Sequence, residues 1–412
     1  MITRRVFLKN GSAALVSLGF TPVFIARAAQ AAQARQKILI AIFQRGAVDG
    51  LNMIVPFGDR SYYSNRPSIA VPRPNATDGA LDLDGFFGLH PRMSSLMPYF
   101  QDGSLAMVHA CGSPDDTRSH FDAQDYMESG TPGLKSTRDG WMNRYLHAKD
   151  HAERSSPFRA VALTQALPRS LQGTAPALAI GQLGQFGIRA GQQSDSMANA
   201  FASQYAQASD ALLGSTGREA FDAVRMLKEA NPGGYTPANG AAYPRSGFGD
   251  AMQQIAQIVK ADLGLEVAFT ELGNWDHHAN EGGSQGQIAN RLNDFAEGIA
   301  AFARDMGDRM ADVVVVTMSE FGRTVKENGN RGTDHGHGNA MLILGGNVKG
   351  GKVYGKWPGL QTEQLYQGRD LAITTDFRDV FSECVTSHLG AKDTSRIFPG
   401  FNSKTKLGFI RT

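Results

Sequence analysis

Three short, almost uninterrupted apolar runs constrain the fold more than any other feature of the sequence. They cover residues 37–43, 265–271 and 312–317 and are rich in Ile, Leu and Val. Strands of a parallel sheet have this composition because helices cover both of their faces. Amphipathic segments with helical spacing, such as residues 288–306, separate and follow these runs. We therefore predict an α/β fold in which a mainly parallel central sheet is sandwiched by helices.

The apolar runs are followed by polar segments, which contain acidic residues and, in places, histidine and glycine. A further polar segment at residues 332–339 (GTDHGHGN) precedes an apolar run at residues 341–344. Because parallel strands end at one edge of a sheet, these side chains are expected to meet. Imidazole and carboxylate groups are favoured ligands of divalent transition metals, and this number suffices for two ions. The sequence predicts a site for one or two ions of zinc, manganese or iron, with the ligands Asp49, Asp276, His277, His278, Glu320, Asp334, His335 and His337. The alternative for residues 332–339 is a Gly/Asn/Asp turn that happens to carry histidines.

The first 28 residues have the pattern of a twin-arginine signal peptide. Arg4 and Arg5 form a paired-arginine region, a mildly apolar stretch follows at residues 13–26, and small-residue cleavage sites come next. We expect a bacterial periplasmic or secreted protein whose partner during export is the twin-arginine translocase. The alternative is an ordinary secretory signal or an uncleaved anchor. Beyond this segment, no apolar run is long enough to form a transmembrane anchor.

Charge and composition bound the remaining possibilities. The 41 basic and 39 acidic residues nearly balance, and no clustered basic face indicates a nucleic-acid partner. Residues 36–412 are predicted to form a single α/β domain. Within it, residues 165–245 are predicted to form a helical or loop insertion, or cap, since Ala, Gly, Gln and Ser dominate much of this stretch.

Five motifs carry a resemblance to a known family: residues 46–52 (GAVDGLN), 118–125 (RSHFDAQD), 319–324 (SEFGRT), 333–339 (TDHGHGN) and 374–378 (TTDFR). On these motifs the chain is identified as a member of the exported bacterial family "domain of unknown function 1501", over nearly the whole mature chain. That family is similar to the alkaline phosphatase and sulfatase superfamily. The resemblance implies an alkaline-phosphatase-like fold, one or two metal ions, and hydrolysis or transfer of phosphate or sulfate esters.

The resemblance also implies metal-binding roles for individual residues. Asp49 resembles the superfamily's first-strand aspartate, and His337 its late histidine. The pair of Asp276 with His278 or His277 resembles its Asp–His pair. Glu320 stands where the superfamily has Asp-His, with Phe321 in place of the histidine, so Asp334 and His335 would supply the missing ligands. The sulfatase signature is absent, which disfavours formylglycine chemistry.

Catalytic and substrate-binding candidates cluster near residue 118. The superfamily places a Ser or Thr nucleophile at a helix N-terminus near a metal, and Ser119 and Thr117 match that position; alternatively, one of them only caps the helix. His120 is a candidate catalytic acid, ligand or packed residue. Arg118 and Arg323 are predicted to hold the substrate anion through bidentate hydrogen bonds, unless they form structural salt bridges.

Two functions are consistent with these features. The favoured one is an exported, metal-dependent hydrolase acting on a small anionic phosphate or sulfate ester, and the sequence does not separate hydrolysis from transfer. The competing one is a non-catalytic exported protein on the same fold, which keeps at most a structural metal and binds a partner or a polymer at the cell surface.

Overall fold

The computed structural model describes residues 35–149, 156–185, 226, 234–403 and 405–411. The predicted signal peptide at residues 1–28 lies outside the described residues, as does most of the predicted insertion at 165–245, so both stay predictions. Residues 1–37 and 38–412 form separate units, and the helices and strands named below all belong to the second. In the described part of the chain, no helix is long and apolar enough to cross a membrane.

A large sheet, with the strand order β11-β5-β10-β9-β1-β8-β6-β7 and β12 beside β5, forms the centre of this unit. Strand β1 (Ile38–Gln44) pairs in parallel with β8 (Val267–Leu272) and β9 (Val313–Met318). Among its described strands, only β10 (Asn339–Gly345) runs antiparallel to its neighbours. The predicted mainly parallel sheet is thus confirmed. The other strands are β5 (Leu105–Gly112), β6 (Ala160–Ala162), β7 (Leu178–Ala179), β11 (Val353–Tyr354) and β12 (Thr375–Asp376).

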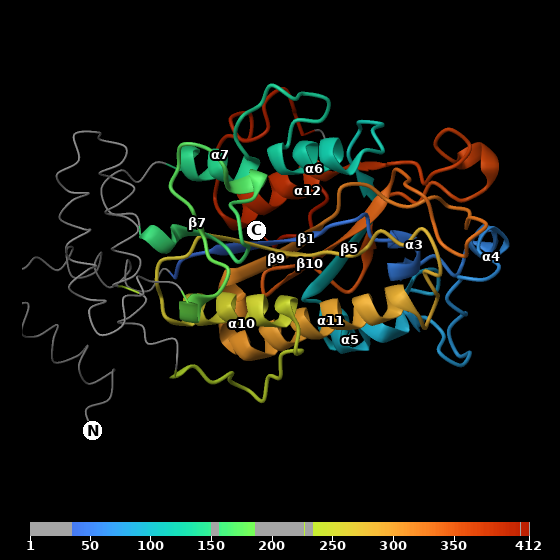
Figure 1. Cartoon of the computed structure of the whole chain (residues 1–412), viewed down its shortest axis with the longest axis horizontal. Coiled ribbons are helices and arrows are strands. Elements are labelled where there is room, and N and C mark those ends of the chain that lie inside the picture. Colours follow the sequence, from blue (N-terminus) through green and yellow to red (C-terminus); the bar gives the residue numbers. More distant parts are fainter. Residues whose placement is uncertain (1–34, 150–155, 186–225, 227–233, 404, 412) are drawn as a thin grey trace, which may run out of the picture. The chain divides into compact units, whose positions relative to one another are not determined.

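Helices cover both faces of the sheet (Figure 1). Side chains alternate along β1, as they do in any strand. Ile40 and Ile42 join the hydrophobic core on the side of α10 (Gly247–Lys260) and α11 (Gln287–Met306). Leu39 and Phe43 join the opposite core, beneath α7 (Trp141–Ala148) and α12 (Phe377–Glu383). Two buried faces explain why β1 reads as a continuous apolar run.

The helices begin and end where local chemistry allows. In α11, Ile288, Leu292 and Phe295 form a fully buried stripe at helical spacing. Helix α12 begins after Asp376, whose carboxylate accepts a hydrogen bond from the Arg378 N–H (2.9 Å). The remaining helices are α3 (Gly50–Met53), α4 (Arg60–Asn65), α5 (Met97–Gln101), α6 (His120–Ser129), the 3₁₀ turns η1 (Pro91–Leu96), η2 (Pro157–Arg159), η3 (Arg169–Leu171), η4 (Leu183–Gln185), η7 (Gly307–Asp312) and η8 (Thr362–Gln364), and a π-helical turn η9 (Cys384–His388). A small sheet joins β2 (Ile54–Val55), β4 (Gly88–Leu89) and β3 (Leu81–Asp82).

The strand directions bring the polar segments together. Strands β1, β5, β8 and β9 point the same way, so the residues that follow them lie at one edge of the sheet. Because β10 is antiparallel, its beginning lies at that same edge, and so does the segment at residues 332–338 before it. Five segments that are distant in sequence therefore meet, as the strand pattern predicted.

Candidate metal centre

Four side chains from three segments converge at this edge, and we call them the imidazole cluster: His120, Asp276, His278 and His335. The Nε2 atom of His335 lies 3.0 Å from the Nε2 atoms of both His120 and His278. One carboxylate oxygen of Asp276 lies 3.0 Å from His278 Nε2 and 3.2 Å from His335 Nε2. Its other oxygen lies 3.5 Å from His120 Nε2. Nitrogen and oxygen ligands about 2.0–2.2 Å from a tetrahedral ion are separated by roughly 3.3–3.5 Å. The ligand atoms of His120, Asp276 and His335 approach this spacing.

The second ring nitrogen of each histidine contacts a hydrogen-bond acceptor. His120 Nδ1 lies 2.8 Å from Glu320, and His278 Nδ1 lies 3.0 Å from Asp334. His335 Nδ1 donates to the backbone carbonyl of Arg118 (2.9 Å). Acceptors at Nδ1 hold the proton there, so in the neutral rings each Nε2 carries the lone pair, and the Nε2 of His335 lies near those of His120 and His278. Metal-binding histidines have this arrangement, in which an acceptor fixes the tautomer. His120, Asp276 and His335 thus form a donor set whose ligand atoms all lie within 4.8 Å of one another, and His278 contacts two of these three residues.

Glu320 is fully buried and supports His120, although the sequence placed it among the ligands. Its Oε1 accepts hydrogen bonds from Gly46 N–H, His120 Nδ1 and Gln124 Nε2, and its Oε2 lies 3.1 Å from the Ser319 hydroxyl. Burial alone would raise the pKa of Glu320, but the hydrogen bonds outweigh it and hold this pKa below its usual value. The same hydrogen bond raises the pKa of His120 despite partial burial. Glu320 is therefore an anion, and its carboxylate holds the His120 ring in place.

Arg323 is buried next to the cluster and holds Asp276 and the surrounding backbone in place. Its guanidinium donates to the backbone carbonyls of Gly46, Ala47, Trp275 and Thr333 and to the carboxylate of Asp276 (2.6 Å). Burial alone would raise the pKa of Asp276, but Arg323 and the nearby histidines lower it to about 2. Arg323 thus contacts groups of the chain itself, which agrees with the structural role considered for it and not with the predicted role of holding a substrate anion. A side chain at Gly322 would place its Cβ 1.8 Å from the Gly338 carbonyl, so glycine lets these two segments touch.

Asp49 lies apart from the imidazole cluster and already has a cationic partner. The guanidinium of the buried Arg66 contacts both of its carboxylate oxygens. Asp49 also caps α3 by accepting from Leu51 N–H, and it hydrogen-bonds with the buried Glu281. Burial and the Asp49 charge raise the pKa of Glu281, whereas Arg66 outweighs burial and lowers the pKa of Asp49. One guanidinium thus neutralises this buried carboxylate pair.

Two predicted ligands face other surroundings. The His337 ring stacks on Tyr366 with 4.2 Å between ring centroids, and burial lowers its pKa. His337 also lines a narrow crevice with Thr117 and Glu320. His277 is 8% exposed and lines a different cavity beside Asp276. Neither histidine belongs to the described group whose ligand atoms lie close enough to share an ion.

The nucleophile candidates lie at the start of α6, directly before His120. Ser119 is the N-cap residue and is exposed, but its hydroxyl makes no capping hydrogen bond. Thr117 Oγ1 instead accepts from the Ser119 N–H (3.2 Å). Arg118, between them, contacts the buried carboxylate of Asp370 (2.6 Å). The ion pair with Asp370 agrees with a structural role for Arg118 and not with the predicted role of holding a substrate anion.

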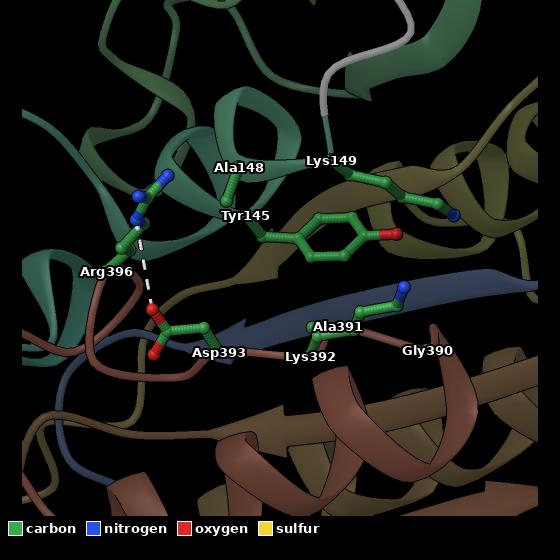
Figure 2. Close-up of a pocket in the computed structure, with 8 residues that line it drawn as sticks. All are labelled: Tyr145, Ala148, Lys149, Gly390, Ala391, Lys392, Asp393 and Arg396. Carbon is green, nitrogen blue, oxygen red and sulfur yellow. Dashed lines mark ion pairs between the residues drawn. The ribbon is translucent and has the colours of Figure 1, made fainter.

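At least two of the cavities among the described residues offer room for a ligand. The first has a volume of about 650 Å³ and adjoins the cluster through Asp276; it is lined by Asn274, Asp276, His277, Gln287, Asn290, Arg291 and Asp294. The second, of about 480 Å³, lies between the end of α7 and residues 390–396 (Figure 2). Figure 2 shows Lys149 and Lys392 beside the hydroxyl end of Tyr145, and Arg396 paired with Asp393. None of the cluster residues lines this second cavity.

Sequence reasoning missed several contributors. Gln124 had a readable signal, because it lies one helical turn after His120, and both side chains contact Glu320. Arg66 and Glu281 had no such signal, since a sequence does not show which charged residues become buried together.

The comparisons with solved structures give low similarities. The zinc complex of the C-terminal periplasmic domain of EcEptC from Escherichia coli is 9% identical, with a TM-score of 0.38 over 90% of this chain and 89% of that chain. PsFucS1 sulfatase from Pseudoalteromonas sp. is 11% identical, with a TM-score of 0.40 over 87% and 69%. A protein in the alkaline phosphatase superfamily from Vibrio parahaemolyticus is 9% identical, with a TM-score of 0.35 over 78% and 62%.

No curated protein matches this chain significantly. Residues 36–396, which include all four residues of the imidazole cluster, match the family described as "Protein of unknown function (DUF1501)". The chain belongs to this family, as the motifs predicted.

Proposed function

We propose that this protein is an exported, metal-dependent hydrolase of an anionic phosphate or sulfate ester, with His120, Asp276, His278 and His335 as the metal ligands. The close approach of the ligand atoms of His120, Asp276 and His335, with His278 Nε2 3.0 Å from His335 Nε2 and every Nδ1 engaged by an acceptor, supports this proposal. Mixed imidazole and carboxylate ligation suits zinc, manganese or iron. Since Asp49 is neutralised by Arg66, the proposal is for one ion.

A bound divalent ion would polarise the ester oxygens and favour the deprotonated nucleophile. The chain prepares the site for this role. Glu320 and Asp334 hold two of the rings in orientation, and Arg323 keeps Asp276 ionised and in place. Ser119 exposes its hydroxyl at the N-terminus of α6, next to His120, where the helix dipole favours negative charge. We therefore propose Ser119 ahead of Thr117 as the nucleophile.

Export is part of the same proposal. The paired Arg4 and Arg5 support a twin-arginine signal and a periplasmic or secreted location. Replacing both arginines with lysine should leave the full-length chain in the cytoplasm, measured by fractionation of cells. Unchanged export of the double variant would instead indicate an ordinary secretory signal.

A second function has specific support. With His278 as a fourth ligand beside His120, Asp276 and His335, the protein would close a tetrahedral site, as in structural zinc centres. In addition, both predicted anion clamps are paired with acidic groups of the chain itself. These observations favour a non-catalytic exported protein with a structural metal.

Turnover of model esters separates the two functions. Metal-loaded wild type should hydrolyse an aryl phosphate or an aryl sulfate, and His335→Ala should lose at least about 10²-fold of this activity. The exposed His147→Ala serves as the control and should keep it. Loss in Ser119→Ala with bound metal retained would support Ser119 as the nucleophile. Stoichiometric metal without turnover of either ester would favour the non-catalytic function.

A further inference from the structure

The 650 Å³ cavity beside Asp276 has one wall made by α11. Gln287, Asn290, Arg291 and Asp294 line it at positions i, i+3, i+4 and i+7, which form one stripe along a helix. Ile288, Leu292 and Phe295 occupy the core-facing stripe. The residues that follow β8, Asn274, Asp276 and His277, make the other wall. Every lining side chain carries an amide, a charged group or an imidazole, so the cavity is a polar one.

Arg291 is the guanidinium available in this cavity. Within the described residues it makes no ion pair or hydrogen bond through its side chain, although Asp294 is three residues away. Arg118 and Arg323, by contrast, contact Asp370 and Asp276. The first turn of α11 contains no acidic residue, so the dipole of this 20-residue helix adds to the positive potential.

His277 offers an imidazole to a ligand in this cavity. The residue is 8% exposed and lines the cavity, and none of the described residues hydrogen-bonds to its ring. Its ring nitrogens are therefore available to hydrogen-bond a ligand. Next to it, Asp276 belongs to both the cavity lining and the imidazole cluster, so the cavity adjoins the proposed metal centre.

We propose that this cavity binds the substrate of the proposed hydrolase, and that the substrate is an anionic ester of a hydroxyl-rich alcohol, as in a sugar phosphate or a sugar sulfate. Arg291 pairs with the tetrahedral anion, because a guanidinium matches its oxygens. The amides of Asn274 and Asn290 and the carboxylate of Asp294 hydrogen-bond the hydroxyl groups. The volume lies within the range of small-molecule sites, about 300–1,000 Å³. The proposal rests on the proposed function for the position of the reacting ester, but its test is equilibrium binding.

Calorimetry on the intact, metal-loaded chain provides that test. The probes are glucose 6-phosphate and glucose 6-sulfate, with phenyl phosphate as the hydroxyl-free control. Wild type should bind at least one glucose ester more tightly than phenyl phosphate. Arg291→Ala should weaken this binding about tenfold or more. Asn290→Ala should weaken it severalfold without changing phenyl phosphate binding. The glucose ester that binds more tightly shows whether the cavity prefers a phosphate or a sulfate group.

Lys392→Ala, in the separate cavity of Figure 2, is the matched control and should bind like wild type. Equal affinity for phenyl phosphate and both glucose esters would overturn the proposal, as would equal losses in Arg291→Ala and Lys392→Ala. Binding that follows these expectations without turnover would refute the hydrolase but not the cavity. Turnover that is unaffected by Arg291→Ala would refute the cavity but not the hydrolase.

Discussion

Replacing Glu320 with glutamine tests how the chain prepares its metal ligands. The structure indicates that glutamine fits without loss of a hydrogen bond. Its Oε1 can accept from Gly46, His120 and Gln124, and its new N–H group can donate to Ser319 Oγ, which itself donates to the Gln44 carbonyl (2.8 Å). We therefore expect the free energy of unfolding of the metal-free protein to change by less than about 1 kcal/mol.

The metal affinity should respond much more strongly. Glu320→Gln removes the negative charge 2.8 Å from His120 Nδ1 in a fully buried position, which makes the imidazole a weaker ligand. Loss of such a supporting group typically costs 10–100-fold in metal affinity. This range corresponds to about 1.4–2.7 kcal/mol. Competition with a chromophoric zinc chelator measures the change.

Asp334→Asn supplies the matched comparison. Asp334 supports His278 as Glu320 supports His120, but its side chain is 53% exposed. Water screens an exposed charge, so this variant should lose only about two- to fivefold in affinity. The surface substitution Glu363→Gln should have no effect. Equal losses for the buried and the exposed variant, or an unchanged affinity of Glu320→Gln, would refute the reasoning.

Two further predictions concern stability. Arg66→Met leaves the buried Asp49 without its cation, and chemical denaturation should show a loss of about 3–5 kcal/mol at neutral pH; a loss below about 1 kcal/mol would contradict the buried pair. Asp305 accepts hydrogen bonds from Tyr243 and Lys260, which outweigh burial and lower its pKa from the ordinary 3.8. A lowered pKa in the folded state stabilises above pH 3.8, and this stabilisation disappears as the pH falls through the folded-state pKa. Asp305→Asn should therefore cost about 3 kcal/mol at pH 7, and the gap to wild type in urea unfolding should shrink below about pH 4; a constant gap would contradict this assignment.

The sheet was predictable because burial on both faces leaves a simple sequence pattern. The runs at residues 37–43 and 312–317 became β1 (Ile38–Gln44) and β9 (Val313–Met318) with shifts of one residue. The gathering of polar segments at one edge followed from strand direction alone. The antiparallel direction of β10 was not readable from its apolar composition, yet it is what brings residues 332–338 to the site.

The ligand set was harder to predict, because it depends on which way side chains turn at glycine-rich segments. His335 and His337 are two residues apart, but His335 joins the cluster while His337 stacks on Tyr366. Gly336 and Gly338 leave the backbone free to adopt many conformations, so the sequence does not show which of the two histidines turns toward the cluster. His120 comes from a helix after β5, and its role depends on contacts with Glu320 and His335 that are 200 and 215 residues distant.

The metal content of the mature protein, purified through its native export route, tests the central claim most directly. Elemental analysis should find one divalent ion per chain in wild type, none in His335→Ala, and one in His337→Ala, whose imidazole lies outside the cluster. A wild type without metal would contradict the proposed centre. So would a His337→Ala variant that loses its metal as His335→Ala does, since the ion would then lie elsewhere.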